Sequence, residues 1–213
     1  MQGKNVIEIG AYDVNGTLRG LVTGLGPATY TGTDIVPGPG VDEVCPIEKL
    51  AERYGEERFD VVICTEVLEH VLDWRSAVAN MKAILKPDGT LLATTRSKGF
   101  PYHGYPYDFW RYEVGDFESI FGDLEIESVE ADPSAPGVFL KARKHRPFSP
   151  RNLEAYELYS VVTKRRCRRI GELDVAMLRF RHAARDLISQ FTPSRAKVIL
   201  RRLYPNISRL WRE

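Results

Sequence analysis

The chain has 213 residues, of which 43% are hydrophobic and 28% charged, and its formal net charge is +1, as in ordinary globular proteins. No apolar run approaches the roughly 20 residues of a membrane span, so we expect no transmembrane segment. Three cysteines are too few and too scattered for a disulfide framework or a thiolate metal site. We therefore expect a cytoplasmic protein with no leader peptide ahead of its first strand.

The charge is unevenly distributed along the chain. Residues 146–213 hold sixteen Lys and Arg against six Asp and Glu, a net charge of +10, whereas the remainder carries −9. This asymmetry favours either contact between the two parts or attraction of the tail to an anionic partner. We expect a domain over residues 1–147 and a basic helical extension over residues 148–213.

Strand and helix patterns alternate from the start of the chain. An apolar strand breaks at Gly10 into a polar turn, and a second strand ends close to Asp34. A later apolar run is typical of a parallel strand that is buried on both faces. The elements predicted here are a strand over Asn5–Ile9, a short helix over 18–25, a strand over Thr29–Ile35, a short strand over Val41–Val44, a helix over Ile47–Tyr54 and a strand over Phe59–Cys64.

The alternation continues to about residue 145. Asp73 suits the N-cap of a helix whose apolar stripe includes Ala77, Met81 and Ile84. The short turn between the last two strands implies an antiparallel hairpin. The elements predicted here are a helix over Asp73–Leu85, a turn at Lys86–Gly89, a strand over Thr90–Thr95, an aromatic loop over 97–112, a helix over Val114–Phe121 and strands over Leu124–Ala131 and Val138–Arg143.

Residues 151–213 show helical spacing and no strand signal. We expect at least two helices, with Thr192-Pro193-Ser194 as a break before a third. Three roles stay open for this tail: a lid or a homodimer contact through its helices, a surface for nucleic acid or another anion, and a peripheral membrane contact. The two apolar faces that predict the helices consist of Leu153, Tyr156, Leu158, Val161 and Val162, and of Leu173, Met177, Phe180, Ala184, Leu187 and Ile188.

Polar residues stand where the predicted parallel strands end. Because such ends share one edge of a sheet, they describe a nucleoside-binding crevice. The three-glycine fingerprint of dinucleotide sites is absent, since only Gly10 and Gly16 occur here, which counts against NAD. Gly10 lets the backbone approach a ligand closely. Asp34 can accept hydrogen bonds from ribose hydroxyls, and Glu8 and Asp13 can attract an ammonium group.

Four segments in this order resemble the class I S-adenosylmethionine-dependent methyltransferases, namely V-I-E-I-G, Y-T-G-T-D-I, F-D-V-V-I-C-T-E-V-L-E-H-V and L-K-P-D-G-T-L-L-A-T-T. The resemblance covers about residues 4–145. It implies an α/β, Rossmann-like, seven-stranded, mostly parallel sheet with one antiparallel edge strand, and S-adenosyl-L-methionine as cofactor. Tyr12 replaces the usual second glycine, so the loop must run differently. The candidate cofactor residues are Glu8, Gly10, Ala11, Asp13, Asp34, Ile35, Cys45, Cys64, Thr65 and Glu66.

The segment Thr65–His70 carries the sharpest local pattern, E-x-x-E-H. In a helix Glu66, Glu69 and His70 lie on one face, where they can bind Mg²⁺ or Mn²⁺. The arrangement is similar to that of metal-dependent methyltransferases acting on small-RNA 3′ ends and on ubiquinone precursors. In the RNA enzymes a loop supplies a further histidine, here His103. The alternative is that no metal binds, and that His70 or His103 is the general base.

The aromatic loop supplies the candidate substrate residues. Its rings suit a sugar or a ring-shaped substrate, and they can also stack on nucleic-acid bases. In the alternative interpretation the rings pack on the sheet edge as a lid. The candidate substrate residues are Tyr102, Tyr107, Asp108 and Arg111.

We therefore expect an S-adenosylmethionine-dependent O-methyltransferase that acts on a hydroxyl of a small molecule, such as a sugar, a glycoconjugate or a secondary metabolite. The methyl transfer would be an in-line displacement, in which positioning supplies most of the rate. RNA 2′-O-methylation is the alternative, suggested by the E-x-x-E-H pattern, by His103 and by the basic tail. A third hypothesis is a binding module without turnover, against which Glu8, Asp34 and His70 argue.

Overall fold

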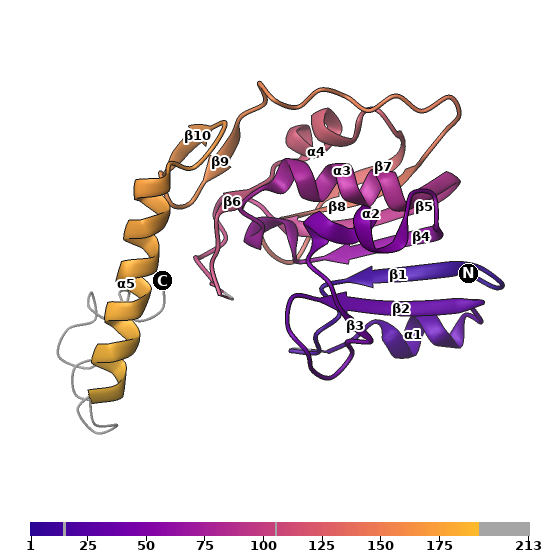
Figure 1. Cartoon of the computed structure of the whole chain (residues 1–213). Helices are drawn as coiled ribbons and strands as arrows, with labels where there is room; N and C mark the ends of the chain where they lie inside the picture. The colour runs from indigo at the N-terminus through magenta and orange to yellow at the C-terminus, as the bar shows by residue number, and fades with distance from the viewer. Residues whose placement is uncertain (15, 105, 192–213) are drawn as a thin grey trace.

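The computed structural model describes residues 1–14, 16–104 and 106–191, the last seven of these as backbone only (Figure 1). Strands and helices alternate through the first two thirds of the chain. The elements are β1 (Asn5–Ile9), α1 (Arg19–Gly24), β2 (Thr29–Asp34), β3 (Glu43–Val44), η1 (Ile47–Lys49), α2 (Leu50–Tyr54), β4 (Phe59–Thr65), η2 (Leu68–His70), α3 (Trp74–Ile84), β5 (Leu85–Arg96), β6 (Trp110–Arg111), α4 (Val114–Phe121), β7 (Glu125–Ala131), β8 (Gly137–Arg143), β9 (Leu158–Ser160), β10 (Arg165–Cys167) and α5 (Glu172–Phe191).

The main sheet has seven strands in the order β3-β2-β1-β4-β5-β8-β7. The first five run parallel, and β8 runs antiparallel to both β5 and β7. The predicted Rossmann-like sheet and its hairpin are thus confirmed, and the reversed strand lies next to the outermost one. Strand order changes direction between β1 and β4, which is where open α/β sheets bind their ligands.

Two hydrophobic cores lie on opposite faces of this sheet. Helices α2, α3 and α4 cover one face, and α1 covers part of the other (Figure 1). Since side chains alternate along a strand, Ile7 and Val62 join the larger core, whereas Val6, Val61 and Ile63 join the smaller core beside α1. The central strands are therefore buried on both faces, as their continuous apolar sequences predict.

The local signals of α3 agree with the structure. The Asp73 carboxylate accepts a hydrogen bond of 3.3 Å from the backbone N–H of Ser76, which caps the helix. Ala77, Met81 and Ile84 are fully buried against the sheet. The helix therefore begins and ends within a residue of its predicted bounds.

The turn predicted at Lys86–Gly89 lies instead inside β5. This strand already begins at Leu85, and its pairing with β4 shifts register between Phe59 and Val61. Asp88 adopts a φ of +63°. The proline, aspartate and glycine of this segment therefore form an irregularity within a continuous strand, which a local turn signal cannot distinguish from a true turn.

The helix predicted from Leu153 to Val162 is wrong. The hairpin of β9 and β10 occupies this region, and β9 pairs with β6, so that Ser160 lies opposite Trp110. Leu158 and Ser160 are fully buried, and Tyr159 between them is half-buried. This alternation is short and depends on pairing with a distant segment, so the apolar spacing alone favoured a helix.

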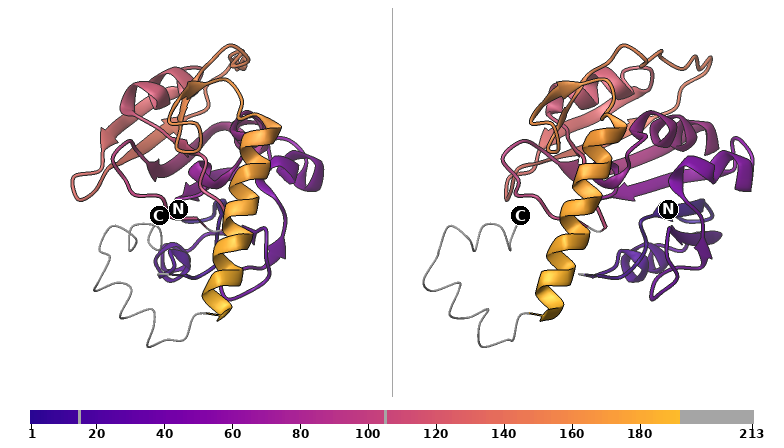
Figure 2. Two further views of the ribbon diagram at one scale, coloured as in Figure 1. Left: turned by 90° about the vertical axis from the view of Figure 1, so that its left-hand side faces the viewer. Right: turned by 60° about the vertical axis from the view of Figure 1, so that its left-hand side comes forward.

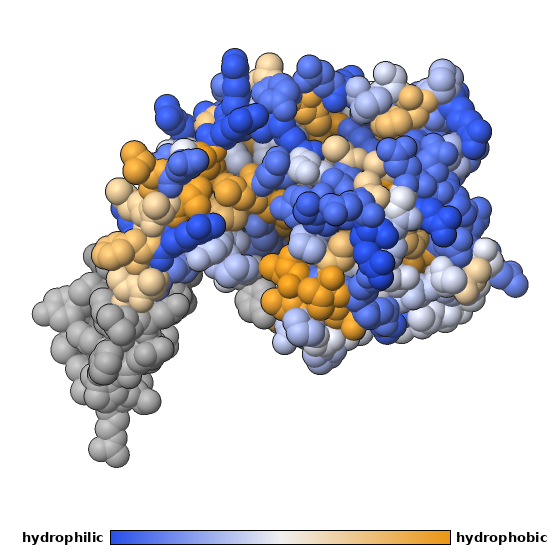
Figure 3. All heavy atoms as spheres, viewed as in Figure 1, coloured by the Kyte–Doolittle hydropathy of each residue, from blue (hydrophilic) through white to orange (hydrophobic). Residues whose placement is uncertain are grey.

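The helix that the second apolar face of the tail predicts is confirmed as α5, which extends away from the body of the molecule (Figure 1). Val175 is buried, whereas Leu173, Met177 and Phe180 are 85%, 56% and 72% exposed, and apolar spheres appear over this helix in Figure 3.

The predicted break at Thr192-Pro193-Ser194 and the third helix lie outside the described residues. The predicted homodimer through these helices stays a prediction. Among the described helices, none combines the length and the hydrophobicity that crossing a bilayer requires.

Candidate active site at the carboxyl edge of the sheet

The turn after β1 begins with Gly10, whose φ of +78° favours glycine. Its N–H donates a hydrogen bond of 2.8 Å to the carbonyl of Thr33. A Cβ at this position would lie 2.2 Å from Cγ2 of Val67, which follows β4. The absent side chain thus allows the segments after β1 and β4 to touch, and the glycine serves this contact in addition to any approach of a ligand.

Asp34 ends β2 and accepts two backbone hydrogen bonds, from Tyr12 at 3.2 Å and from Val36 at 3.3 Å. The ring of Tyr12 packs against the glycine of the next loop, since a Cβ on Gly38 would lie 1.9 Å from Cε2 of that ring. The loop does run differently from the glycine-rich pattern, because Tyr12 joins it to the Pro-Gly loop after β2. Asp34 is partly exposed and retains lone pairs for a ligand.

Two other candidates of this turn have smaller roles. Ala11 is buried, and its N–H donates a hydrogen bond of 3.0 Å to the carbonyl of Thr33. Asp13 is exposed and accepts a hydrogen bond of 2.9 Å from the N–H of Gly16, which stabilises its own turn. Ala11 can offer only its backbone to a ligand.

Glu8 lies under the sheet edge, not on it. The residue is 3% exposed, and its carboxylate accepts a hydrogen bond from the hydroxyl of Tyr30. Burial raises the pKa of Glu8, although the charge of Arg19 opposes this shift. The prediction that this carboxylate attracts an ammonium group of the ligand is wrong in this arrangement, because its neighbours in β2 enclose it.

Two exposed apolar side chains flank the end of β2. Ile35 is 53% exposed and Val44 is 51% exposed. Cys45, predicted at the adenine edge, is buried, and its N–H donates a hydrogen bond of 2.9 Å to the carbonyl of Asp34. Ile35 and Val44 thus offer a surface for a flat ring, and of residues 44–47, which the sequence places over the adenine edge, Val44 is an exposed apolar residue and Cys45 is enclosed.

Cys64 and Thr65 close β4. Cys64 is fully buried, and burial raises the pKa of its thiol, so it is a packing residue and no nucleophile. Thr65 is half-buried. Of these two residues, only Thr65 is available to a ligand at the edge, through its backbone and its side chain.

Glu66 leaves the strand with a φ of +57°, and η2 begins only at Leu68. The predicted helical face that joins Glu66 to Glu69 and His70 is therefore wrong. The Glu66 carboxylate accepts a hydrogen bond of 2.8 Å from the hydroxyl of Thr94 and forms an ion pair with Arg96. Burial, followed by the charge of Glu69, raises the pKa of Glu66. The structure keeps this residue out of the metal-ligand cluster that the sequence predicts.

Glu69, His70 and His103 do come together. Their potential ligand atoms all lie within 4.8 Å of one another. Oε1 of Glu69 lies 3.5 Å from Nε2 of His103 and 3.9 Å from Nε2 of His70. The two imidazole rings have their centroids 4.8 Å apart. Residues from η2 and from the aromatic loop thus converge on one point.

Other contacts fix the orientation of both imidazoles. Nδ1 of His70 lies 2.7 Å from the carbonyl oxygen of Tyr107, and Nδ1 of His103 lies 3.0 Å from the Asp108 carboxylate. Because a carbonyl or carboxylate oxygen only accepts, each Nδ1 carries the proton. Each ring is thereby turned so that its Nε2 faces Oε1 of Glu69.

Glu69 is fully buried, yet only one of its oxygens is satisfied. Oε2 accepts a hydrogen bond of 2.7 Å from the hydroxyl of Thr95, whereas Oε1 accepts none from the described residues. A buried carboxylate oxygen of this kind is costly unless something binds it. One carboxylate and two imidazoles form a donor set that fits a divalent cation.

The electrostatics of His103 describe the cluster without an ion. Burial alone would lower the pKa of His103, but hydrogen bonds to Asp108 and Glu69, together with their charges, raise it to about 9. The two carboxylates thus stabilise the protonated imidazole of His103. A divalent cation at this point would take the place of the proton on Nε2.

Asp108 and Arg111 support the loop from inside. Arg111 is 1% exposed and donates hydrogen bonds to the Asp108 carboxylate, one of them 2.7 Å long, and to the carbonyls of Phe100 and Pro101. Hydrogen bonds to Arg111 and His103 outweigh burial and lower the pKa of Asp108. The prediction that both residues contact substrate is wrong, since they are enclosed and satisfied within the chain.

Tyr102 and Tyr107 are half-buried at the tip of the same loop, and their rings remain available to an acceptor. The ring of Tyr107 packs at 5.9 Å from that of Phe109, and both tyrosines contact His182 of α5. Phe109, by contrast, is buried in the main core. Its ring packs against the body of the molecule, as the alternative interpretation of the loop expects.

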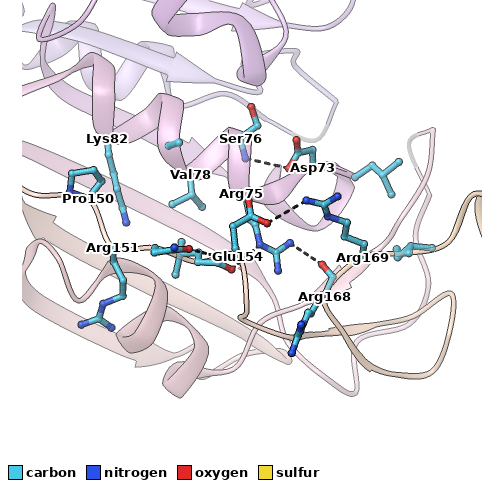
Figure 4. A pocket seen from close by; sticks show the side chains of 15 residues that line it. Asp73, Arg75, Ser76, Val78, Lys82, Pro150, Arg151, Glu154, Arg168 and Arg169 are labelled. Carbon is cyan, nitrogen blue, oxygen red and sulfur yellow. Dashed lines mark hydrogen bonds and ion pairs between the residues drawn. The ribbon is translucent and has the colours of Figure 1, made fainter.

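A separate hollow of about 680 Å³ lies between α3 and the segments 150–154 and 168–170 (Figure 4). Arg75 donates hydrogen bonds to the carbonyls of Leu153 and Arg168, and Arg169 pairs with Glu154 at 3.2 Å. The hydrogen bonds of Arg75 attach the start of the tail to α3, and the ion pair of Arg169 and Glu154 joins two segments of the tail (Figure 4). The hollow lies on a helix face, away from the strand ends.

Comparison with known proteins agrees with this architecture. Residues 1–123 match the family model described as a methyltransferase domain. The chain is 54% identical over 110 residues to the ubiquinone biosynthesis O-methyltransferase of Actinobacillus pleuropneumoniae serotype 5b, covering 44% of this chain and 46% of that protein. It is 40% identical over 55 residues to the human mitochondrial ubiquinone biosynthesis O-methyltransferase, covering 26% and 15%. The matches thus span less than half of the length of these relatives.

A solved structure shows the same fold. The 1,6-didemethyltoxoflavin-N1-methyltransferase of Burkholderia thailandensis, with bound 1,6-didemethyltoxoflavin and S-adenosylhomocysteine, superposes with a TM-score of 0.56 at 19% sequence identity, over 68% of this chain and 72% of that one. The family match covers more than half of the chain and includes β1, β2, β4 and β5, whose ends form the edge described above. The chain therefore belongs to the methyltransferase domain family and has the fold of the S-adenosylmethionine-dependent methyltransferases.

Proposed function

We propose that the protein is an S-adenosylmethionine-dependent O-methyltransferase acting on a hydroxyl of a small molecule. The observation that carries this proposal is the convergence of Glu69, His70 and His103 at the edge where β1 and β4 end. A buried, unsatisfied carboxylate oxygen beside two oriented imidazoles suits the binding and deprotonation of a hydroxyl. The named function of the curated relatives supports oxygen as the acceptor atom.

The residues around the end of β2 fit the cofactor. Asp34 would accept hydrogen bonds from the ribose hydroxyls, while Ile35 and Val44 would pack on the adenine. The backbone at Gly10 and Thr65 would face the methionine part. S-adenosylmethionine supplies a methyl group that its positive sulfur has already activated. The chain's part is to hold the two reactants in line, which can contribute most of the rate.

Glu69, His70 and His103 would hold a divalent cation such as Mg²⁺ or Mn²⁺. The chemistry of such an ion is to bind the acceptor oxygen and to lower the pKa of its hydroxyl. Asp108 and the carbonyl of Tyr107 keep the imidazoles turned toward this point. In the metal-free alternative, Nε2 of His70 takes the proton directly.

For the acceptor we propose a ring-bearing hydroxyl compound, with a phenol ahead of a sugar. Tyr102 and Tyr107 offer aromatic faces beside the cluster, and the relatives named above take part in ubiquinone biosynthesis. RNA is the weaker candidate, because neither of those relatives is named for it.

The test is methyl transfer from labelled S-adenosylmethionine to a panel of phenols and catechols, sugars and short RNAs. We expect product from a phenol, loss of turnover with a chelator, and its return with Mg²⁺ or Mn²⁺. Chelator-insensitive turnover would exclude the metal and leave His70 as the base. Labelling of RNA with a steep dependence on salt would overturn the small-molecule proposal.

A further inference from the structure

Helix α5 touches the aromatic loop as well as the core. Val175 is buried in the main core, and Leu178 packs against it. On the next turn of the same side, His182 is half-buried and reaches the loop. Figure 2 shows α5 on the side of the molecule that is turned toward the viewer. The helix thus joins the acceptor side of the molecule, although it begins about 25 residues beyond the predicted domain boundary at residue 147.

His182 contacts two tyrosines of the loop. Its Nε2 lies 2.6 Å from the hydroxyl of Tyr102, and the two rings have their centroids 5.5 Å apart. The ring of Tyr107 meets His182 edge-on, at 5.5 Å and an interplanar angle of 90°. Arg179, one turn earlier, lies over Tyr107 at 5.9 Å. One side chain of α5 therefore packs against both ends of the loop tip.

These two tyrosines flank the groups that orient the imidazoles. Tyr102 directly precedes His103 in the chain. The carbonyl of Tyr107 accepts the hydrogen bond from Nδ1 of His70, and the next residue, Asp108, accepts that from Nδ1 of His103. The position of the loop tip thus sets where both Nε2 atoms lie relative to Glu69.

We propose that His182 is a positioning residue of the acceptor site. Its contacts with Tyr102 and Tyr107 hold the loop so that His70 and His103 both face Glu69. Helix α5 is then a working part of the site, and the proposed boundary at residue 147 separates two segments that act together. The expected effect of His182 on the binding of metal and acceptor rests on the proposed function. Its expected effect on the order of the loop does not.

The experiment compares His182→Ala with Met177→Ala in the full chain. Met177 lies on the exposed side of α5 and is 56% exposed, so its replacement keeps the helix and spares the loop. The first readout is amide hydrogen exchange at His103 and Phe109. The N–H of His103 donates to the Asp108 carboxylate at 3.0 Å, and that of Phe109 donates to the backbone carbonyl of Glu69 at 2.8 Å. We expect exchange at both amides to rise about tenfold in His182→Ala only.

The second readout is binding of Mn²⁺ alone, measured by calorimetry. Residues that orient metal ligands typically affect affinity by about 10–100-fold, and we expect the lower end of this range for His182→Ala. We expect S-adenosylhomocysteine to bind equally to both variants. His182→Gln, which retains a polar group for Tyr102, should recover part of the loss.

Equal exchange of the loop amides in the two variants would overturn the proposal. So would a rise in exchange that extends equally to β4 and β5, because His182 would then stabilise the fold in general. If the unaltered protein binds no Mn²⁺, the metal part of the proposed function fails, while the loop amides still decide the role of His182.

Discussion

The two halves of the sheet's carboxyl edge use their polar groups differently. At the end of β2, Asp34 is already hydrogen-bonded to backbone amides of two loops, and exposed apolar side chains flank it. Next to β4 and β5, Glu69 is fully buried with one oxygen that no described residue satisfies. The first half is a cradle whose polar groups are already hydrogen-bonded within the chain, whereas in the second Oε1 of Glu69 faces the imidazoles of His70 and His103.

The strongest test of this contrast is Glu69→Gln against Glu66→Gln. We expect Glu69→Gln to lower kcat by at least about 100-fold, because the cluster loses its only carboxylate ligand while its shape remains. Glu66→Gln should have a much smaller effect, since Glu66 pairs with Arg96 outside the cluster. Steady-state kinetics with the phenol substrate measures both. Equal losses would show that the two carboxylates act as one site.

The cradle is tested by Asp34→Ala. Removing its hydrogen bonds to the ribose should weaken cofactor binding by about 1–3 kcal/mol, measured as the Kd of S-adenosylhomocysteine by calorimetry. Asp13→Ala is the matched control, because Asp13 is exposed and stabilises only its own turn. Unchanged affinity in Asp34→Ala would remove this residue from the cofactor site.

The contact between the halves is tested by Gly10→Ala. The left-handed φ costs an alanine about 1–2 kcal/mol, and the clash with Val67 adds to this. We expect a lower free energy of unfolding in urea, and partial recovery in the double variant Gly10→Ala, Val67→Ala. A double variant as unstable as the single one would show that Val67 is not the obstacle.

The smallest expected effect lies at the opposite edge of the sheet, at Asp60. Hydrogen bonds from the Asn5 N–H and Lys86 outweigh burial and lower the pKa of Asp60 below its ordinary value of 3.8. The stabilisation is therefore present above about pH 4 and is lost as the pH falls through the lower folded-state pKa. Asp60→Asn should cost less than about 1 kcal/mol near neutral pH and flatten the acid limb of a stability-pH curve. An unchanged limb would contradict this assignment.

The sequence predicts the cradle better than the cluster. Gly10 and Asp34 stand at the ends of apolar strands. The carboxyl ends of parallel strands share one edge of the sheet, and this does not depend on the conformation of the loops. The E-x-x-E-H pattern places Glu69 and His70 beside one another, as they lie in the structure, but it assumed a helix that also includes Glu66. The left-handed backbone at Glu66 turns this residue away, and no local propensity announces it.

Long-range contacts account for the other errors. The sequence predicts Arg111 as a substrate residue, yet the fold buries it against loop carbonyls. The hairpin of β9 and β10 joins a small sheet in which β9 pairs with the distant β6, and three-residue strands leave no periodicity to detect. His182 was hidden within an amphipathic helix, where only the packed structure distinguishes its neighbours.

The buried guanidinium of Arg111 also bears on protein engineering. It fixes the stem of the aromatic loop at Phe100 and Pro101 on one side and at Asp108 on the other. The short stretch between these anchor points also carries Tyr102 and Tyr107, whose contacts with His182 hold its tip. Libraries for new acceptor preferences would therefore vary these tyrosines together with His182, on a stem that Arg111 keeps in place.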